Sequence, residues 1–511
     1  MATSNRTNLW MVVVVLLGGI ASLLWAERLP VGGGFGWDGQ NYGAWARDFN
    51  KAVIVDKVND YYVQRIAPSA IIHFSTKQIL RPFYSHHRIG EILAENKNII
   101  LAFGIYNLVL LILSAWLWGR IADRLTLTDL GKWFGFCALF INYAIAKSNA
   151  YQPVLLDTSA FFLGLLMFHF FLNRNSWGLL AVIIVSGFTW PTLPVMATML
   201  LVLPRPNREP APPPLALATI RWLSAGAAAL VTIGVGLIFV YLIRQEVLQG
   251  WDRTGMVRIN FGLLYLSIAA TLAYLFFAFR IALNDGQLWN LPGIIRTVQW
   301  KWAAAALLVL LLQRIAYHQL QGPVLSYWKF SDFIFYTFIS SLTEPFIFLV
   351  AHAVYYGPII LLVAIFWRPF CERASELGTG FKLFVILNLA LSICPQSRYQ
   401  LPSVGAFAIV MVWIVDGWRL NRWHLAVWVL LSLLYSKVWY TFNTGPMNPT
   451  DTASLLSFPL QHFFMNSGPW MSHSMYLVQG TVVLATLVAL LLIVVKTRPR
   501  PNAENQLSAM T

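Results

Sequence analysis

Long apolar runs recur along almost the whole chain and are separated by short segments that carry most of its charges. A run of about 20 apolar residues crosses a bilayer as an α-helix, because a helix satisfies its own backbone hydrogen bonds in hydrocarbon. Only 11% of the residues are charged, against about 25% in soluble domains. The sequence therefore predicts an all-α polytopic membrane protein and not a soluble domain with a single core.

The apolar runs predict about 12–14 transmembrane helices. The segment 176–203 is either one long broken helix or a hairpin of two short helices hinged at Trp190-Pro191, because proline interrupts helical hydrogen bonding. The first run has a cleavable signal peptide as its alternative, but an uncleaved span better explains the aromatic-rich segment that follows. Apart from 176–203, spans are expected near residues 10–25 (the first run), 98–118, 131–148, 154–172, 221–243, 261–280, 301–315, 346–367, 382–395, 401–418, 423–440 and 476–495.

Lys and Arg residues indicate the orientation, because cytoplasmic loops are enriched in them. With a cytoplasmic N-terminus and a hairpin at 176–203, the inner loops hold most basic residues, among them Arg120, Arg174, Arg205 and Arg368. A single span at 176–203 would invert every later loop and place the basic C-terminal tail outside. Charge therefore favours the hairpin, with both termini in the cytoplasm.

This topology gives the chain three expected parts. Residues 1–203 form an N-terminal transmembrane module, 204–220 a Pro-rich cytoplasmic linker and 221–511 a C-terminal transmembrane module. The extracytoplasmic loop 26–97 is long, and its apolar patches AVIV (52–55) and IAPSAIIHF (66–74) predict helices that lie along the membrane interface. The outer segments 316–345 and 441–475 are expected to roof a cavity together with this loop.

Composition also narrows the partners. The net charge of +15 is explained by basic cytoplasmic loops, so no nucleic acid partner is expected. The three cysteines, Cys137, Cys371 and Cys394, are widely spaced, and we predict no structural disulfide. The inner loops are too short for a nucleotide-binding domain, which argues against an ATP-driven pump.

Charged residues on the outer face are the candidates for chemistry, since charges near a bilayer are costly. Asp38 follows a glycine-rich turn in GWDGQNY and could act as a base, but an aspartate there is also typical of a helix cap. Arg65, in YVQRIAP, offers a forked set of donors to a phosphate, or else extends from an interfacial helix into water. Asp157, in LLDTSAFF, has a helix cap as its alternative role. For Arg398, in QSRYQLP, the alternatives are an extension of the side chain into water and an interhelical contact.

These segments, in this order and on one face, resemble the GT-C class of integral-membrane glycosyltransferases. The match is closest to bacterial members of unassigned substrate, through GWDGQNY, YVQRIAP, LLDTSAFF and QSRYQLP. The resemblance implies a multi-span enzyme with a polyprenyl-phosphate-linked sugar donor and an acidic catalytic residue soon after the first span, here Asp38. Many members carry a second acidic residue beside the first, whereas position 39 is Gly here and Asp48 lies on another helix face. A divalent metal is therefore possible but not implied, and a single aspartate base is the safer expectation.

The expected reaction is inverting transfer of the sugar to an acceptor hydroxyl of a glycan, lipid or protein. Asp38 would be the general base on the extracytoplasmic face of the plasma membrane, a bacterial inner membrane by the resemblance. The residues expected to bind substrate or phosphate are Arg65, Arg398, Tyr399, Asp157, Gln40 and Tyr42. Two rivals are an O-antigen-type polymerase or ligase, whose large loop normally comes late in the chain, and a transporter or flippase of lipid-linked sugars, which normally shows inverted repeats.

Overall fold

The computed structural model describes residues 2–206, 215–253, 255, 257–323, 330–418, 420–443 and 465–497. Helices account for 78% of the described residues. Within these ranges there are no β-strands, and the one extended pairing is an isolated bridge between Val58 and Gln321. The all-helical fold predicted from the apolar runs is therefore confirmed.

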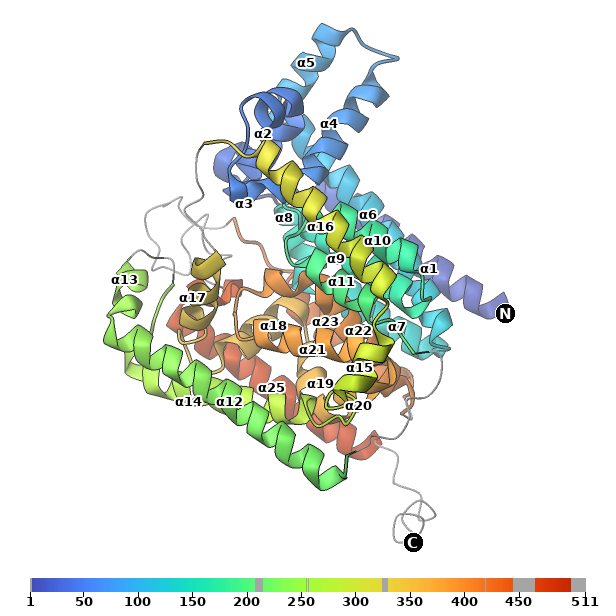
Figure 1. The fold of residues 1–511 in the computed structure, drawn as a ribbon. Helices are drawn as coiled ribbons and strands as arrows, with labels where there is room; N and C mark the ends of the chain where they lie inside the picture. The colour runs from blue at the N-terminus through green and yellow to red at the C-terminus, as the bar shows by residue number, and fades with distance from the viewer. Residues whose placement is uncertain are drawn as a thin grey trace.

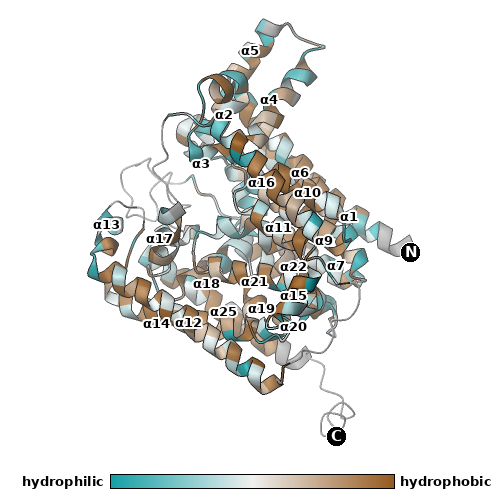
Figure 2. Ribbon diagram, viewed as in Figure 1, coloured by the Kyte–Doolittle hydropathy of each residue, from teal (hydrophilic) through white to brown (hydrophobic). Residues whose placement is uncertain are grey.

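Seven helices of the described chain are long and apolar enough to cross a membrane, some of them together with a preceding 3-10 turn. They are α1 (Ala2–Trp25), α6 (Asn96–Arg124), α12 (Leu217–Arg244), α14 (Leu264–Ala282) with η4 (Phe261–Leu263), α16 (Trp300–Leu320), α22 (Leu401–Asp416) with η5 (Ser397–Gln400), and α25 (His473–Thr497). Several of these helices are hydrophobic along most of their length (Figure 2). Their number is consistent with a helical membrane protein.

Shorter helices occupy the remaining predicted spans. Five of them are apolar: α9 (Asp157–Leu172), α10 (Ser176–Gly187), α11 (Leu193–Val202), α18 (Ile347–Tyr356) and α21 (Thr379–Leu391). The others are α7 (Asp129–Phe140), η3 (Tyr143–Ser148), α8 (Asn149–Tyr151), α19 (Ile359–Ile365), α20 (Trp367–Glu376) and α23 (Arg422–Ser436). Two predicted spans are thus interrupted, 131–148 at Asn142 and 346–367 at Gly357, whose φ of +81° suits glycine.

Helices α10 and α11 form a hairpin that turns at Trp190-Pro191, as predicted. Trp177 at the start of α10 packs on Trp302, and the Gln299 amide near the start of α16 donates to Val202 at the end of α11. Both open ends therefore lie beside the start of α16, which crosses them in Figure 1. At the far end, the Tyr317 hydroxyl bonds to the Gly187 carbonyl at 2.6 Å.

The segment between α1 and α6 folds into short helices. They are η1 (Val31–Gly34), α2 (Asp38–Arg47), η2 (Asn50–Val55), α3 (Asp60–Val63), α4 (Ala67–Leu80) and α5 (His86–Ala94). The patches AVIV and IAPSAIIHF are helical, as predicted, within η2 and α4. Helices α4 and α5 project from one end of the molecule (Figure 1).

The segments predicted to be extracytoplasmic contact the first loop. The Val58 amide donates to Leu320 at the end of α16, and the Ala67 amide donates to Phe188 in the hairpin turn. Glu27, just after α1, accepts from Lys147 Nζ at 2.6 Å and from the Phe442 amide at 2.7 Å. Residues far apart in sequence thereby form one layer above the ends of the long helices.

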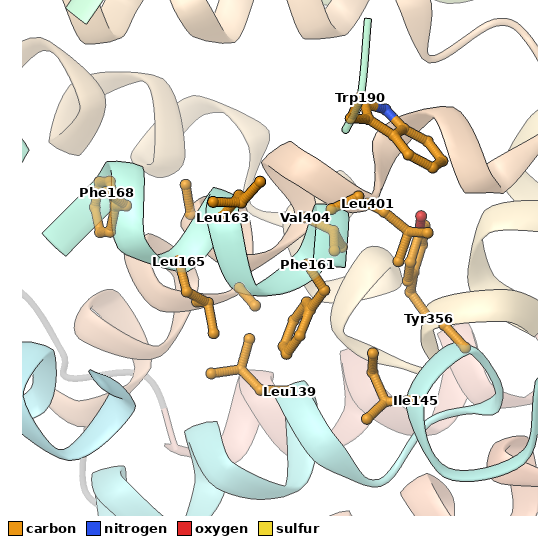
Figure 3. Packing of buried hydrophobic residues seen from close by; sticks show 14 of the residues in the cluster. Leu139, Ile145, Phe161, Leu163, Leu165, Phe168, Trp190, Tyr356, Leu401 and Val404 are labelled. Atoms are coloured by element: carbon orange, nitrogen blue, oxygen red, sulfur yellow. The ribbon is translucent and has the colours of Figure 1, made fainter. Parts of the chain in front are cut away.

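The core lies between α9 and α22, which run side by side in the same direction. Figure 3 shows Phe161 of α9 beside Val404 and Leu401 at the start of α22, while Leu165 of α9 points toward Leu139 of α7. Gly164 permits this approach, because a methyl group there would overlap the Pro402 carbonyl oxygen. Close contact of these two helices brings their first residues together.

The remaining short helices α13 (Val247–Arg253), α15 (Leu291–Thr297), α17 (Phe330–Ser340) and η6 (Gly468–Trp470) connect the longer ones. The three cysteines are buried and free. Parts of the predicted linker (207–214) and of the two later outer segments (324–329 and 444–464) lie outside the described residues.

Candidate active site

Asp38 is the first residue of α2, and a glycine-rich turn precedes it. Gly32 and Gly33 have φ values of +61° and +66°, which L side chains rarely adopt, so the chain turns sharply before the helix. The helix cap is Trp37, and no side-chain cap bond is made. The capping alternative for Asp38 is therefore wrong: its Oδ1 instead accepts a 3.1 Å hydrogen bond from the Tyr62 hydroxyl.

Arg65 is held by the neighbouring Tyr61. Its Cζ lies 3.8 Å from the centre of the Tyr61 ring, and its Nη1 donates to the Tyr61 carbonyl. The rings of Tyr61 and Tyr62 meet edge to face, with their centres 4.9 Å apart. One tyrosine thus contacts the arginine while the next contacts Asp38.

Tyr42 forms the buried wall beside Asp38. Its ring makes edge contacts with Trp45 at 5.5 Å and with Tyr62 at 6.2 Å. Burial raises the pKa of Tyr42 and of Tyr62, and the negative charge of Asp38 raises both further, so both phenols stay protonated. Gln40 is not part of this group, because its exposed side chain lies against Gly32.

Asp157 and Arg398 join the starts of α9 and α22. Arg398 Nε lies 3.0 Å from each carboxylate oxygen of Asp157, and its Nη2 lies 2.8 Å from Oδ1. The Asp157 side chain is 9% exposed and that of Arg398 is 28% exposed. The cap of α9 is Leu156, without a side-chain bond, so capping is also wrong for Asp157. The interhelical contact predicted as the alternative role of Arg398 is observed.

Several buried polar side chains hold the backbone next to Arg398. His352 Nδ1 lies 2.9 Å from Ser397 Oγ, and its Nε2 lies 2.8 Å from the Ser392 carbonyl. The Tyr356 hydroxyl donates to the Ser397 carbonyl, one residue before Arg398. Sequence reasoning missed these residues as well as Tyr62, because a His or Tyr inside an apolar run gives no local signal of its partner.

The charged and phenolic groups of this site lie close enough to interact electrostatically. Arg398 lies within reach of the Asp38 charge, and Tyr399 within reach of both Arg65 and Arg398. Tyr399 also packs its ring on Phe333, with centres 5.1 Å apart. Of the six predicted binding residues, Tyr42 and Arg398 therefore lie near Asp38. Three more, Arg65, Asp157 and Tyr399, lie next to one of these two, and Gln40 does not join them.

Several polar atoms of this site remain available to a ligand. Within the described residues, neither Asp38 Oδ2 nor Arg398 Nη1 makes a hydrogen bond. No group of three or more His, Cys, Asp or Glu side chains in that part of the chain is placed to hold a metal ion. The site therefore combines the Asp38 carboxylate, the Asp157–Arg398 ion pair and the Arg65 guanidinium among aromatic rings.

No protein family, no curated protein and no solved structure matches this chain.

Proposed function

We propose that the protein is a membrane glycosyltransferase of the GT-C type. It transfers a sugar from a polyprenyl-phosphate-linked donor to an acceptor hydroxyl on a glycan, lipid or protein, with inversion. The observation that carries this proposal is the gathering of Asp38, Arg65 and the Asp157–Arg398 pair from three distant segments at one end of the apolar helices. A base and phosphate donors beside a bilayer suit a lipid-phosphate leaving group.

Asp38 acts as the general base. The Tyr62 hydroxyl orients Oδ1, so Oδ2 accepts the proton of the acceptor hydroxyl as its oxygen attacks the anomeric carbon. The bond between that carbon and the phosphate oxygen breaks as the new bond forms on the opposite face. Such a base contributes about 10²–10⁴-fold to the rate.

The two arginines stabilise the departing phosphate. Asp157 holds Nε and Nη2 of Arg398 in place, so the direction of Nη1 is fixed before the phosphate binds. Binding of the phosphate then costs little additional conformational entropy. Arg65, stacked on Tyr61, supplies a second guanidinium. Tyr399 lies near both arginines and is partly exposed, so its ring suits contact with a sugar, while the buried Tyr42 packs on Tyr62 beside Asp38.

The proposed setting is a bacterial inner membrane, with both termini in the cytoplasm and the site on the extracytoplasmic face. The support is the distribution of charge along the sequence: outside the long loop that carries Asp38, most basic residues fall in the predicted inner loops, among them Arg120, Arg174, Arg205 and Arg368. Basic loops remain on the cytoplasmic side during insertion.

Consumption of lipid-linked sugar in membranes that contain wild type or Asp38→Asn tests the proposal. Asparagine keeps an acceptor for Tyr62 but cannot take a proton, so turnover is expected to fall by about 10²–10⁴-fold. Asp48→Asn is the matched control, since Asp48 is exposed in the same loop and is expected to leave turnover unchanged.

Three results would contradict the assignment. Full activity of Asp38→Asn removes the base. Movement of the lipid-linked sugar across the membrane without its consumption indicates the flippase alternative, while extension of a glycan chain by preassembled units indicates the polymerase or ligase alternative.

A further inference from the structure

A cavity of about 270 Å³ lies between α1, α6 and the α7–η3 segment. Apolar side chains line most of it, among them Val15, Leu111 and Phe140. Its rim includes Val14 and Val438, which are 44% and 47% exposed, so the cavity opens on the outer surface of the helices. Its volume is close to the lower end of the range of small-molecule pockets.

Two adjacent glycines of α1 create this space. Gly19 packs directly against Leu108 of α6, where a methyl group would overlap the leucine side chain. At Gly18 no atom lies within 4 Å of the position of an added Cβ, so the same helix leaves room one residue earlier. The cavity is therefore built into the α1–α6 contact.

Arg28 is one of the residues that line the cavity. Its guanidinium donates to the Leu23 carbonyl at 2.9 Å, and it forms no ion pair with any residue in the described ranges. The adjacent Glu27 is already engaged by Lys147 and by the amides of Phe442 and Asn443. An unneutralised guanidinium at the edge of an apolar cavity favours an anionic ligand.

We propose that this cavity holds one hydrocarbon tail of an anionic bilayer phospholipid, with the lipid phosphate on Arg28. Helix α1 is long enough to cross a membrane, and its exposed Leu17, Leu24 and Trp25 lie next to the cavity on the surface that faces lipid. The surrounding medium thus supplies hydrocarbon tails, and the charge selects the headgroup. The inference does not rest on the proposed transfer reaction, because neither Asp38 nor Arg65 contributes to the cavity.

Native mass spectrometry of the full-length protein tests this site. The purified protein is washed in detergent that contains equimolar phosphatidylglycerol and phosphatidylcholine, and the retained lipid is identified. Wild type is expected to keep one phosphatidylglycerol. Gly18→Leu fills the cavity and is expected to lose it, whereas Gly234→Leu in α12, where an added Cβ also meets nothing within 4 Å, keeps it.

Arg28→Gln separates the headgroup from the tail. This half-buried side chain can be changed without filling the cavity, and the preference for phosphatidylglycerol over phosphatidylcholine is expected to fall about tenfold, as for loss of one charge-assisted hydrogen bond. The proposal is overturned if wild type retains no phosphatidylglycerol, if folded Gly18→Leu retains as much as wild type, or if Arg28→Gln keeps the full preference.

Discussion

The Tyr62 hydroxyl donates a 3.1 Å hydrogen bond to Oδ1 of Asp38, so a residue 24 positions along the chain orients the proposed base. Tyr62→Phe is expected to lower turnover about tenfold, which is less than the loss for Asp38→Asn, because the carboxylate remains but is free to rotate. Initial rates of donor consumption measure this change. Tyr61→Phe is the control, since it keeps the ring beneath Arg65. Equal rates for both variants would remove the orienting role of Tyr62.

His73 makes the first loop sensitive to acid. Its Nδ1 lies 3.0 Å from the Ala46 carbonyl, its Nε2 is buried without a partner in the described chain, and burial lowers its pKa. His73 therefore binds a proton more readily when the segment is unfolded. The folded segment is expected to lose stability as the pH drops below about 6.5, the usual pKa of histidine.

Hydrogen exchange of α2 and α4 at pH 7.5 and 5.5 measures this effect. Wild type is expected to lose protection at pH 5.5, whereas His73→Gln, which cannot titrate, shows the same protection at both values. A loss of protection that persists in His73→Gln would assign the acid sensitivity to another group.

Breaking the Asp157–Arg398 pair is expected to destabilise the protein. Asp157→Asn leaves a largely buried guanidinium without its counter-charge, at a cost of about 3–5 kcal/mol. Thermal unfolding in detergent measures the loss, and Asp157→Asn combined with Arg398→Gln should cost less than the sum of the two single changes. Glu372→Gln, which breaks the exposed pair with Arg368, is expected to cost less than about 1 kcal/mol.

Gly164 tests the close approach of α9 and α22. Gly164→Ala forces a methyl group onto the Pro402 carbonyl and is expected to destabilise the fold by about 1–3 kcal/mol. Gly226→Ala in α12, where nothing lies within 4 Å of the added atom, is expected to be neutral or to stabilise by up to about 1 kcal/mol. Similar melting temperatures for both variants would show that the helices separate easily.

The proposed orientation predicts labelling by a membrane-impermeant maleimide. The native cysteines are buried, so Glu91→Cys in α5 and Asn173→Cys after α9 report their own positions. Glu91→Cys is expected to react in intact cells, and Asn173→Cys only after permeabilisation. The reverse pattern would place Asp38 on the cytoplasmic face.

Much of the helical architecture could be predicted because hydrophobic runs and breaks are local signals. The hairpin at Trp190-Pro191 was predictable from one proline and from the balance of charge. The break after α7 was not, because Asn142 ends one helix and begins the next through its own side chain, which accepts from Ile145 and donates to Ala138. An asparagine in an apolar run does not by itself indicate such a break.

The site was predicted as a set of residues but not as an arrangement. Asp38 and Asp157 are each the first residue of a helix, where the sequence pattern for a cap and for a carboxylate bound by a distant residue is the same. Their partners Tyr62 and Arg398 lie on other elements, so only the fold distinguishes the two roles. Gln40 belongs to the same GWDGQNY motif as Asp38, but two residues along a helix point to different faces.

The Asp157–Arg398 pair also imposes an order on biosynthesis. The two residues are 241 positions apart, and a ribosome adding about 5–20 residues per second needs roughly 12–48 seconds to cover that distance. During this interval Asp157 has entered the membrane region while its counter-charge has not yet been made. The nascent chain must therefore keep the start of α9 near water or near the insertion machinery until α22 has been synthesised. A chain that is truncated or stalled during this interval is the one most exposed to quality control.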